Sequence, residues 1–273
     1  MSKFFTNAVL ILLATFLIVG EPAWAKKETS SAKTATGQTE KHDQPQAGES
    51  KQAAQAVIPV FSFDRPVLES PVVEDPFFGS LGAETLKSLV TRLEKARDDD
   101  DVKAVIVLLG PTQMGTGQLE ELHRALRSVR DAGKPIYAHA DSLSFGKLAL
   151  VSSASRISVA PVGDLFINGL YGSQPHIRGM LDKIHVTPDF ITCGDYKSAG
   201  EMFMRTEPSP EAERMYDWLF DSLFDTYVGL IADGREKTRE EVRKWIDQGL
   251  FSAEKAAELG IIDAAEYRTD MLA

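Results

Sequence analysis

The chain has 273 residues, 43% of them hydrophobic and 26% charged, and its formal net charge at pH 7 is −10. This composition excludes collagen, a coiled coil and a wholly disordered chain. An acidic protein does not attract phosphate backbones, so nucleic acid is excluded as the expected partner. Cys193 is the only cysteine, and the five histidines lack metal-ligand spacing. We therefore expect no disulfide, no metal and no cofactor.

The N-terminus has the three parts of a secretory signal peptide. Lys3 is followed by the apolar run Ala8–Val19, and Ala23-Trp24-Ala25 supplies a small-x-small cleavage site. A run of 12 residues is short for a spanning helix, which needs about 20. We predict a signal peptide at 1–25 that is cleaved after Ala25, with an uncleaved membrane anchor as the alternative. Either way the folded part is expected outside the cytoplasm, in a periplasmic or other extracytoplasmic compartment.

Residues 26–56 are predicted to be a disordered tether. Their only apolar side chains are alanines, and the rest are mostly Lys, Glu, Gln, Thr, Ser and Gly. Such a stretch buries too little apolar area to offset the entropy of ordering the chain. The folded domain is therefore predicted to occupy residues 57–273.

Within this domain, apolar runs rich in β-forming residues alternate with stretches of helical period. In chain order the predicted elements are a strand at 57–63, a helix at 86–96, a strand at 102–109, a helix at 119–129, a strand at 135–138, a helix at 146–154, a strand at 156–160, a helix at 177–184, a strand at 188–192, helices at 210–233 and 239–248, a short helix between Ser252 and Gly260, and a strand at 261–262. Repeated β-α units predict an α/β layer fold with a helical C-terminal part.

A polar segment, Gly194-Asp-Tyr-Lys-Ser-Ala199, follows the predicted strand at 188–192. Ligands of α/β proteins bind at the carboxyl ends of parallel strands. Lys197 could be desolvated there and act as a neutral general base. Spacing alone favours the simpler interpretation, a solvated surface lysine. Cys193, at the end of the same strand, is expected to be a buried thiol.

The segment Asp141-Ser-Leu-Ser-Phe-Gly-Lys-Leu-Ala-Leu150 is a second strand-to-helix turn. A serine at such a turn can be displayed as a nucleophile, with helix N–H groups nearby to bind an oxyanion. Ser142 or Ser144 can also simply cap the helix, and spacing alone favours this second interpretation.

Residues 57–265 resemble the signal peptide peptidase A family, membrane-associated serine peptidases with a Ser/Lys dyad and a Clp protease/crotonase-like fold. Segment 194–199 is similar to the family motif Gly-x-Tyr-Lys-Ser-Ala, and Ser209-Pro-Glu211 is similar to the helix start that follows it. Residues 251–263 resemble the closing helix–strand signature, which the wider fold shares. The resemblance implies that Lys197 is the general base, with motif support from Gly194, Tyr196 and Ser198.

The chain departs from the family pattern where the nucleophile is expected. Active domains carry Ser-Gly-Gly-Tyr-Tyr, and a gapless comparison back from Arg156-Ile157 places Phe145 at the serine. Ser144 lies one residue earlier, Gly146 keeps one family glycine, and Lys147 replaces the next. The oxyanion segment Asp-Ser-Pro-Gly-Gly corresponds to 110–117, where only Gly115 and Gly117 could keep part of the turn.

In long family members two similar domains share one polypeptide, the first supplying the lysine and the second the serine. This chain resembles the first, and the sequence does not tell whether it is the front half of a longer protein. The resemblance implies a base-supplying domain for the hydrolysis of short apolar peptides at the outer membrane face. The serine would come from another domain or chain within a homo- or hetero-oligomer.

Two other hypotheses stay open. The domain could be a non-catalytic exported binding or assembly module of the same fold. Alternatively, Ser144 could replace the missing serine, although a shift of one residue turns a helical side chain by about 100°, away from the family site.

Overall fold

The computed structural model describes residues 56–70, 84–112 and 114–273. The predicted signal peptide at 1–25, and all but the last residue of the predicted tether at 26–56, lie outside these ranges. The described residues belong to one unit of the chain, Gln52–Ala273. Within them, none of the helices combines the length and the apolar character that crossing a bilayer requires.

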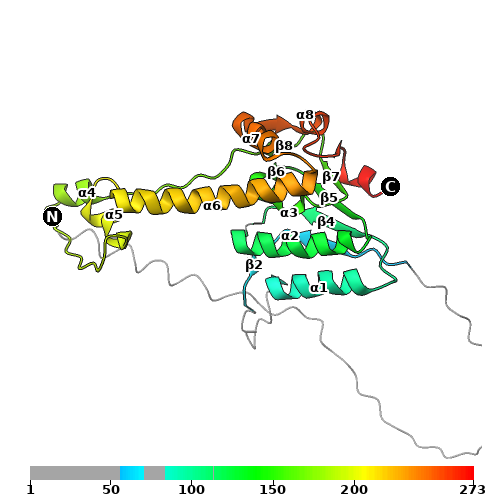
Figure 1. The fold of residues 1–273 in the computed structure, drawn as a ribbon, viewed down its shortest axis with the longest axis horizontal. Helices are drawn as coiled ribbons and strands as arrows, with labels where there is room; N and C mark the ends of the chain where they lie inside the picture. Colours follow the sequence, from blue (N-terminus) through cyan, green and yellow to red (C-terminus); the bar gives the residue numbers. More distant parts are fainter. Residues whose placement is uncertain (1–55, 71–83, 113) are drawn as a thin grey trace, which may run out of the picture. The chain divides into compact units, whose positions relative to one another are not determined.

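A parallel sheet carries the core of the described part (Figure 1). Its strands lie in the order β1 (Val60–Phe63), β4 (Val105–Leu109), β5 (Ile136–Ala140), β7 (Arg156–Val159) and β10 (Ala264–Ala265). In β4, Val107 is aligned with Phe61 of β1 on one side and with Ala138 of β5 on the other. Because parallel strands can be joined only by crossovers, helices lie between them in the sequence. The predicted α/β class is therefore confirmed.

Helices pack on this sheet and on one another through their apolar faces. Contacts join α1 (Leu86–Asp98) to α2 (Thr116–Asp131), α2 to α3 (Phe145–Val151), and α3 to α6 (Pro210–Arg235) (Figure 1). The buried residues of α1 and α2 recur at the helical spacing that the sequence predicts. They are Leu86, Leu89, Leu93 and Ala96 in α1, and Leu119, Leu122, His123, Ala125, Leu126 and Val129 in α2.

Helix α6 has 26 residues, and only its C-terminal part is in the core. It begins where predicted, because the Ser209 side chain accepts a hydrogen bond from the Ala212 N–H and Pro210 occupies the first turn. Near its end α6 approaches α3 closely. A Cβ added at Gly234 would lie 2.5 Å from the carbonyl carbon of Ser152, so this contact requires glycine.

Shorter elements complete the described fold. Strand β6 (Leu143–Ser144) pairs with β8 (Asp164–Phe166), and β8 pairs antiparallel with β9 (Leu250–Ser252). Helices α7 (Arg239–Gln248) and α8 (Ala253–Glu258) form as predicted, whereas the small sheet was not predicted. The remaining elements are β2 (Val67–Leu68), β3 (Glu84–Thr85), α4 (Arg178–Lys183), the 3-10 helix η1 (Ser198–Gly200), α5 (Glu201–Met204) and α9 (Arg268–Met271).

Three local predictions are wrong. Residues 188–192 form no strand, because no described strand lies beside them and Ile191 is fully exposed at 100%. Cys193 is accordingly exposed and not buried. The predicted strand at 261–262 is replaced by β10 at 264–265, because the N–H groups of Ile261 and Ile262 donate to the Ala256 carbonyl in α8 and not to a strand.

Candidate active site

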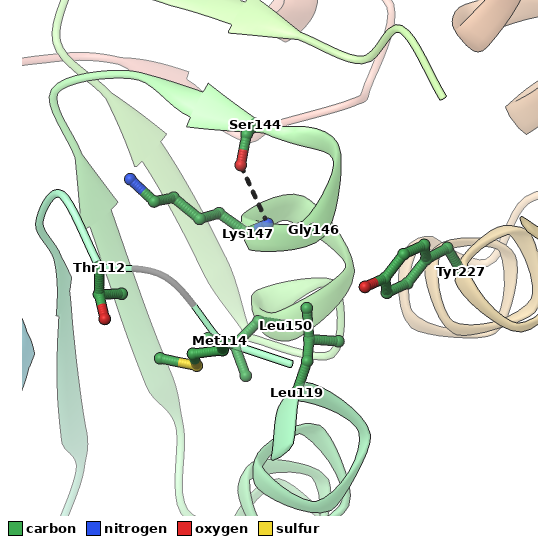
Figure 2. Close-up of a pocket in the computed structure, with 8 residues that line it drawn as sticks. All are labelled: Thr112, Met114, Leu119, Ser144, Gly146, Lys147, Leu150 and Tyr227. Carbon is green, nitrogen blue, oxygen red and sulfur yellow. Dashed lines mark hydrogen bonds between the residues drawn. The ribbon is translucent and has the colours of Figure 1, made fainter. Parts of the chain in front are cut away.

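Helix α3 begins at the position where the resemblance places the nucleophile. Ser144 has extended backbone and caps the helix, its Oγ accepting a hydrogen bond of 3.5 Å from the Lys147 N–H (Figure 2). The next side chain, Phe145, is only 4% exposed. Its ring meets that of Tyr227 edge-on at 5.2 Å and that of Phe224 at 6.2 Å. Phe145 therefore anchors α3 to α6 and presents no reactive group.

A cavity of about 350 Å³ opens beside this helix start. Figure 2 shows its lining, which comes from α2, α3, α6 and the loop after β4: Thr112, Met114, Leu119, Ser144, Gly146, Lys147, Leu150 and Tyr227. Two of its hydroxyls are engaged. Thr112 donates to the Arg65 carbonyl at 2.6 Å, and Tyr227 shares a hydrogen bond of 3.0 Å with Thr116. Ser144 and Lys147 are the remaining polar side chains of the lining.

Lys147 is the feature of this cavity that sequence reasoning missed. Its side chain is half-buried and runs from the helix start toward the loop that carries Thr112 (Figure 2). Burial lowers the pKa of its amine below the ordinary value of 10.5. The spacing Ser144-x-x-Lys147 at a helix start was the available signal, since the N-cap residue and the third helical residue bracket the first turn.

The glycines predicted to shape an oxyanion turn have other roles. Gly115 is the N-cap residue of α2, and its N–H donates to Oε1 of Gln118 at 3.0 Å. Gly117 lies inside the first turn of α2. Gly146 lies in the first turn of α3 and lines the cavity, where an added Cβ would meet Leu119 at 3.4 Å. The Gly115 N–H is thus used within α2 and does not point to an oxyanion.

Lys197 lies in a different place, in residues 178–209, which we call the Lys197 segment. A turn precedes it, with Gly194 at a φ of 93° and the Lys197 N–H donating to the Gly194 carbonyl at 3.2 Å. The placement of Lys197 at the sheet edge is wrong, because this turn is not joined to a strand. The Lys197 side chain is exposed, as is Tyr196, whereas Ser198 is buried at the start of η1.

The Lys197 segment is held together by a few specific contacts. The rings of Phe190 and Phe203 stack at 5.3 Å. The Glu201 carboxylate accepts hydrogen bonds from the Ser209 N–H at 2.9 Å and from the Ser209 hydroxyl. Burial opposes ionisation of Glu201, yet these hydrogen bonds and nearby cationic groups lower its pKa below 4.5. Lys197 lines a shallow cavity of about 420 Å³ over this cluster.

The two regions are not brought together within the chain. Glu201 of the Lys197 segment binds Ser209 at the start of α6, and Phe145 packs on Tyr227, in the C-terminal half of this helix. The intervening 18 residues of helix span about 27 Å at 1.5 Å per residue. Figure 1 shows α5 and α3 beside opposite parts of α6. Lys197 therefore cannot deprotonate a group at the α3 start of its own chain in this arrangement.

Comparison with known proteins supplies a family. The chain is 26% identical over 188 residues to the chloroplastic serine protease SPPA of Arabidopsis thaliana, covering 69% of this chain and 28% of that protein. It is 32% identical over 156 residues to Protease 4 of Haemophilus influenzae, covering 56% of this chain and 25% of that protein. The chain thus spans about a quarter of the length of these curated relatives.

Solved structures give weaker likenesses. A mutant of the membrane-bound stomatin-specific protease 1510-N matches at a TM-score of 0.44 and 10% identity, covering 80% of this chain and 84% of that chain. An enoyl-CoA hydratase/isomerase from Marinobacter aquaeolei matches at a TM-score of 0.39 and 11% identity, covering 68% of this chain and 62% of that chain. The fold assignment rests instead on the parallel sheet of the chain itself. Residues 128–273, more than half of the chain, match peptidase family S49, and the chain belongs to this family.

Proposed function

We propose that this chain is the base-supplying domain of a serine peptidase, in which Lys197 deprotonates a serine held by another domain or chain. The observation that carries the proposal is the pairing of an exposed Lys197, in its matching motif, with a buried Phe145 at the nucleophile position. The exposed lysine is accessible to a second molecule. The separation along α6 favours a partner serine over one within the chain.

In this mechanism the Lys197 amine would take the proton of the partner's serine hydroxyl. The serine oxygen would then form a bond to the peptide carbonyl carbon, and the protonated lysine would return the proton to the leaving amine. The expected substrates are short apolar peptides such as spent signal peptides. The predicted signal peptide at 1–25 favours an extracytoplasmic location at the membrane face.

Mixing the chain with a serine-bearing S49 domain tests the proposal. Hydrolysis of a short apolar fluorogenic peptide should appear in the mixture and be absent from either component alone. The Lys197→Ala variant should abolish the gain, whereas Lys183→Ala, at another exposed lysine of the same segment, should preserve it. A mixture without activity, or activity indifferent to Lys197→Ala, would contradict the proposal.

The exposed apolar side chains of the Lys197 segment support a second candidate, a non-catalytic binding or assembly module. Met180, Ile184, Phe190 and Ile191 are between 43% and 100% exposed. A patch of this kind is typical of surfaces that bind another protein or a peptide. Tight binding of apolar peptides that is unchanged by Lys197→Ala, without hydrolysis in any mixture, would favour this candidate.

A further inference from the structure

The first turn of α3 carries a serine and a lysine that the proposed function does not use. Ser144 is the N-cap residue and Lys147 is the third residue of the helix, so the two residues bracket its first turn. Ser-x-x-Lys at a helix start is the spacing by which penicillin-binding proteins set a lysine beside their nucleophilic serine. Both residues line the cavity of about 350 Å³ shown in Figure 2.

The surroundings of Lys147 supply no counter-ion to its amine. Across the described residues, no carboxylate forms an ion pair with Lys147, and burial is the cause that lowers its pKa. A lysine whose pKa is lowered gives up its proton more readily and can act as a base, whereas an arginine at the same place would stay charged.

Ser144 is the hydroxyl best placed to lose a proton in this cavity. It is exposed, and among the described residues its Oγ takes part in one hydrogen bond, as acceptor of the Lys147 N–H. The Thr112 and Tyr227 hydroxyls are bound elsewhere. Lys147 and Ser144 form no hydrogen bond through Nζ in the ligand-free chain. Such catalytic contacts are often long until substrate is bound.

We propose that Ser144 and Lys147 form an acyl-transfer pair, separate from Lys197, that accepts esters of short apolar acids. The apolar walls of the cavity, Met114, Leu119 and Leu150, fit a short hydrocarbon chain, and its volume excludes a folded polypeptide. This activity goes beyond the proposed function, because it needs no second domain and does not cleave peptides.

The reaction has two balanced halves. Lys147 Nζ takes the proton of the Ser144 hydroxyl, Oγ bonds to the acyl carbon, and the leaving alkoxide departs with the proton from Nζ. Water then gives a proton to Nζ while its oxygen bonds to the acyl carbon. The bond from that carbon to Oγ breaks, and Oγ recovers the proton from Lys147. The products are the alcohol and the free acid.

Labelling of the full chain with a fluorophosphonate, in which Oγ displaces fluoride from phosphorus, tests the pair directly. The label should map to Ser144, and p-nitrophenyl butyrate should be hydrolysed. Lys147→Met should slow both reactions by about 100-fold, the usual contribution of a general base. Lys147→Arg should be equally slow, because guanidinium remains protonated.

Control variants separate chemistry from folding. Ser144→Asn keeps an N-cap residue and removes the nucleophile, so it should fold normally and lose the label. Ser142→Ala, at the neighbouring exposed serine, should label like the parent chain. The proposal is overturned by a folded chain that takes no label, by a label that persists in Ser144→Asn, by wild-type labelling of Lys147→Met, or by labelling that requires Lys197. Because peptide hydrolysis in the mixture is measured separately, failure of either proposal leaves the other testable.

Discussion

The start of α3 and the Lys197 segment lie beside opposite parts of α6. They differ in two respects, their match to the family pattern and their packing. The start of α3 departs from the family pattern at Phe145 but is packed into the core against Tyr227. The Lys197 segment matches the family motif, yet none of its described residues belongs to the hydrophobic core. The comparison teaches that a match to the family motif can lie in a segment with little packing behind it, whereas the departure at Phe145 is held by packing.

The largest expected effect is on the α3 side. Phe145→Ala should lower the free energy of unfolding by about 3–5 kcal/mol, because it leaves a cavity between α3 and α6. Phe190→Ala in the Lys197 segment, where the ring is 43% exposed, should cost only about 1 kcal/mol. Denaturant titration of both variants checks the contrast. Equal losses would mean that the two regions are packed alike.

A smaller effect is expected where α6 begins. Ser209→Ala removes a helix cap and the hydrogen bond from the Ser209 hydroxyl to Glu201, while the bond from the Ser209 N–H remains, and should cost about 1–2 kcal/mol. Hydrogen exchange should become faster at amides of residues 198–213 and stay unchanged in α3. Thr238→Ala, which removes the cap of α7, is the matched control. If it also accelerates exchange at 198–213, the effect of Ser209 is not local.

Near neutral pH, the pH dependence of the free energy of unfolding should come mainly from buried histidines. His123 Nδ1 donates to the Ala149 carbonyl at 2.9 Å, and its buried Nε2 has no hydrogen-bond partner in the described chain. Burial therefore lowers the pKa of His123 below its ordinary 6.5. The unfolded chain then binds the proton more readily than the folded chain, so stability present above pH 6.5 is lost as the pH falls.

The slope for one such group is at most about 1.4 kcal/mol per pH unit. The pKa of His139 is also lowered by burial, so this residue adds to the loss of stability as the pH falls. His123→Asn should flatten the dependence of the unfolding free energy between pH 5 and 7, and an unchanged slope in this variant would contradict the prediction. Glu201 should add to the loss of stability only below about pH 4.5, because its pKa is lowered from that value and the stability given by its ionised carboxylate disappears as the pH falls.

The smallest effect on stability is expected at Lys197. Its side chain is exposed and makes no hydrogen bond or ion pair in the described chain, so Lys197→Ala should change the free energy of unfolding by less than about 0.5 kcal/mol. Thermal unfolding checks this expectation beside the loss of activity in the mixture. A large destabilisation would show that the lysine has a structural role.

Elements with a long, regular apolar pattern could be predicted from the sequence. Helices α1, α2, α6 and α7 and strand β4 lie where hydrophobic period and caps place them. The strand at 188–192 was mispredicted for a physical reason. A strand needs a neighbour to bond to, and an apolar stretch such as Phe190–Thr192 does not reveal whether one is present.

Of the candidate site, the sequence identified Lys197, Phe145 and Ser144 as the residues to consider. It did not identify Lys147 as a cavity residue, because its burial depends on Met114, Leu119 and Tyr227, which come from distant parts of the chain. It also placed Lys197 at the sheet edge, because the apolar stretch at 188–192, before the turn, has the local composition of a strand.

The sequence by itself determined the α/β class, the main helices and the family, because these depend on local period, caps and short motifs. Tertiary structure decided which side chains share a cavity and which are kept apart. The length of α6 separates Lys197 from the start of α3, and the packing of Phe145 on α6 leaves Ser144 and Lys147 facing the same cavity. Such relations join residues far apart in the chain, so no local pattern contains them.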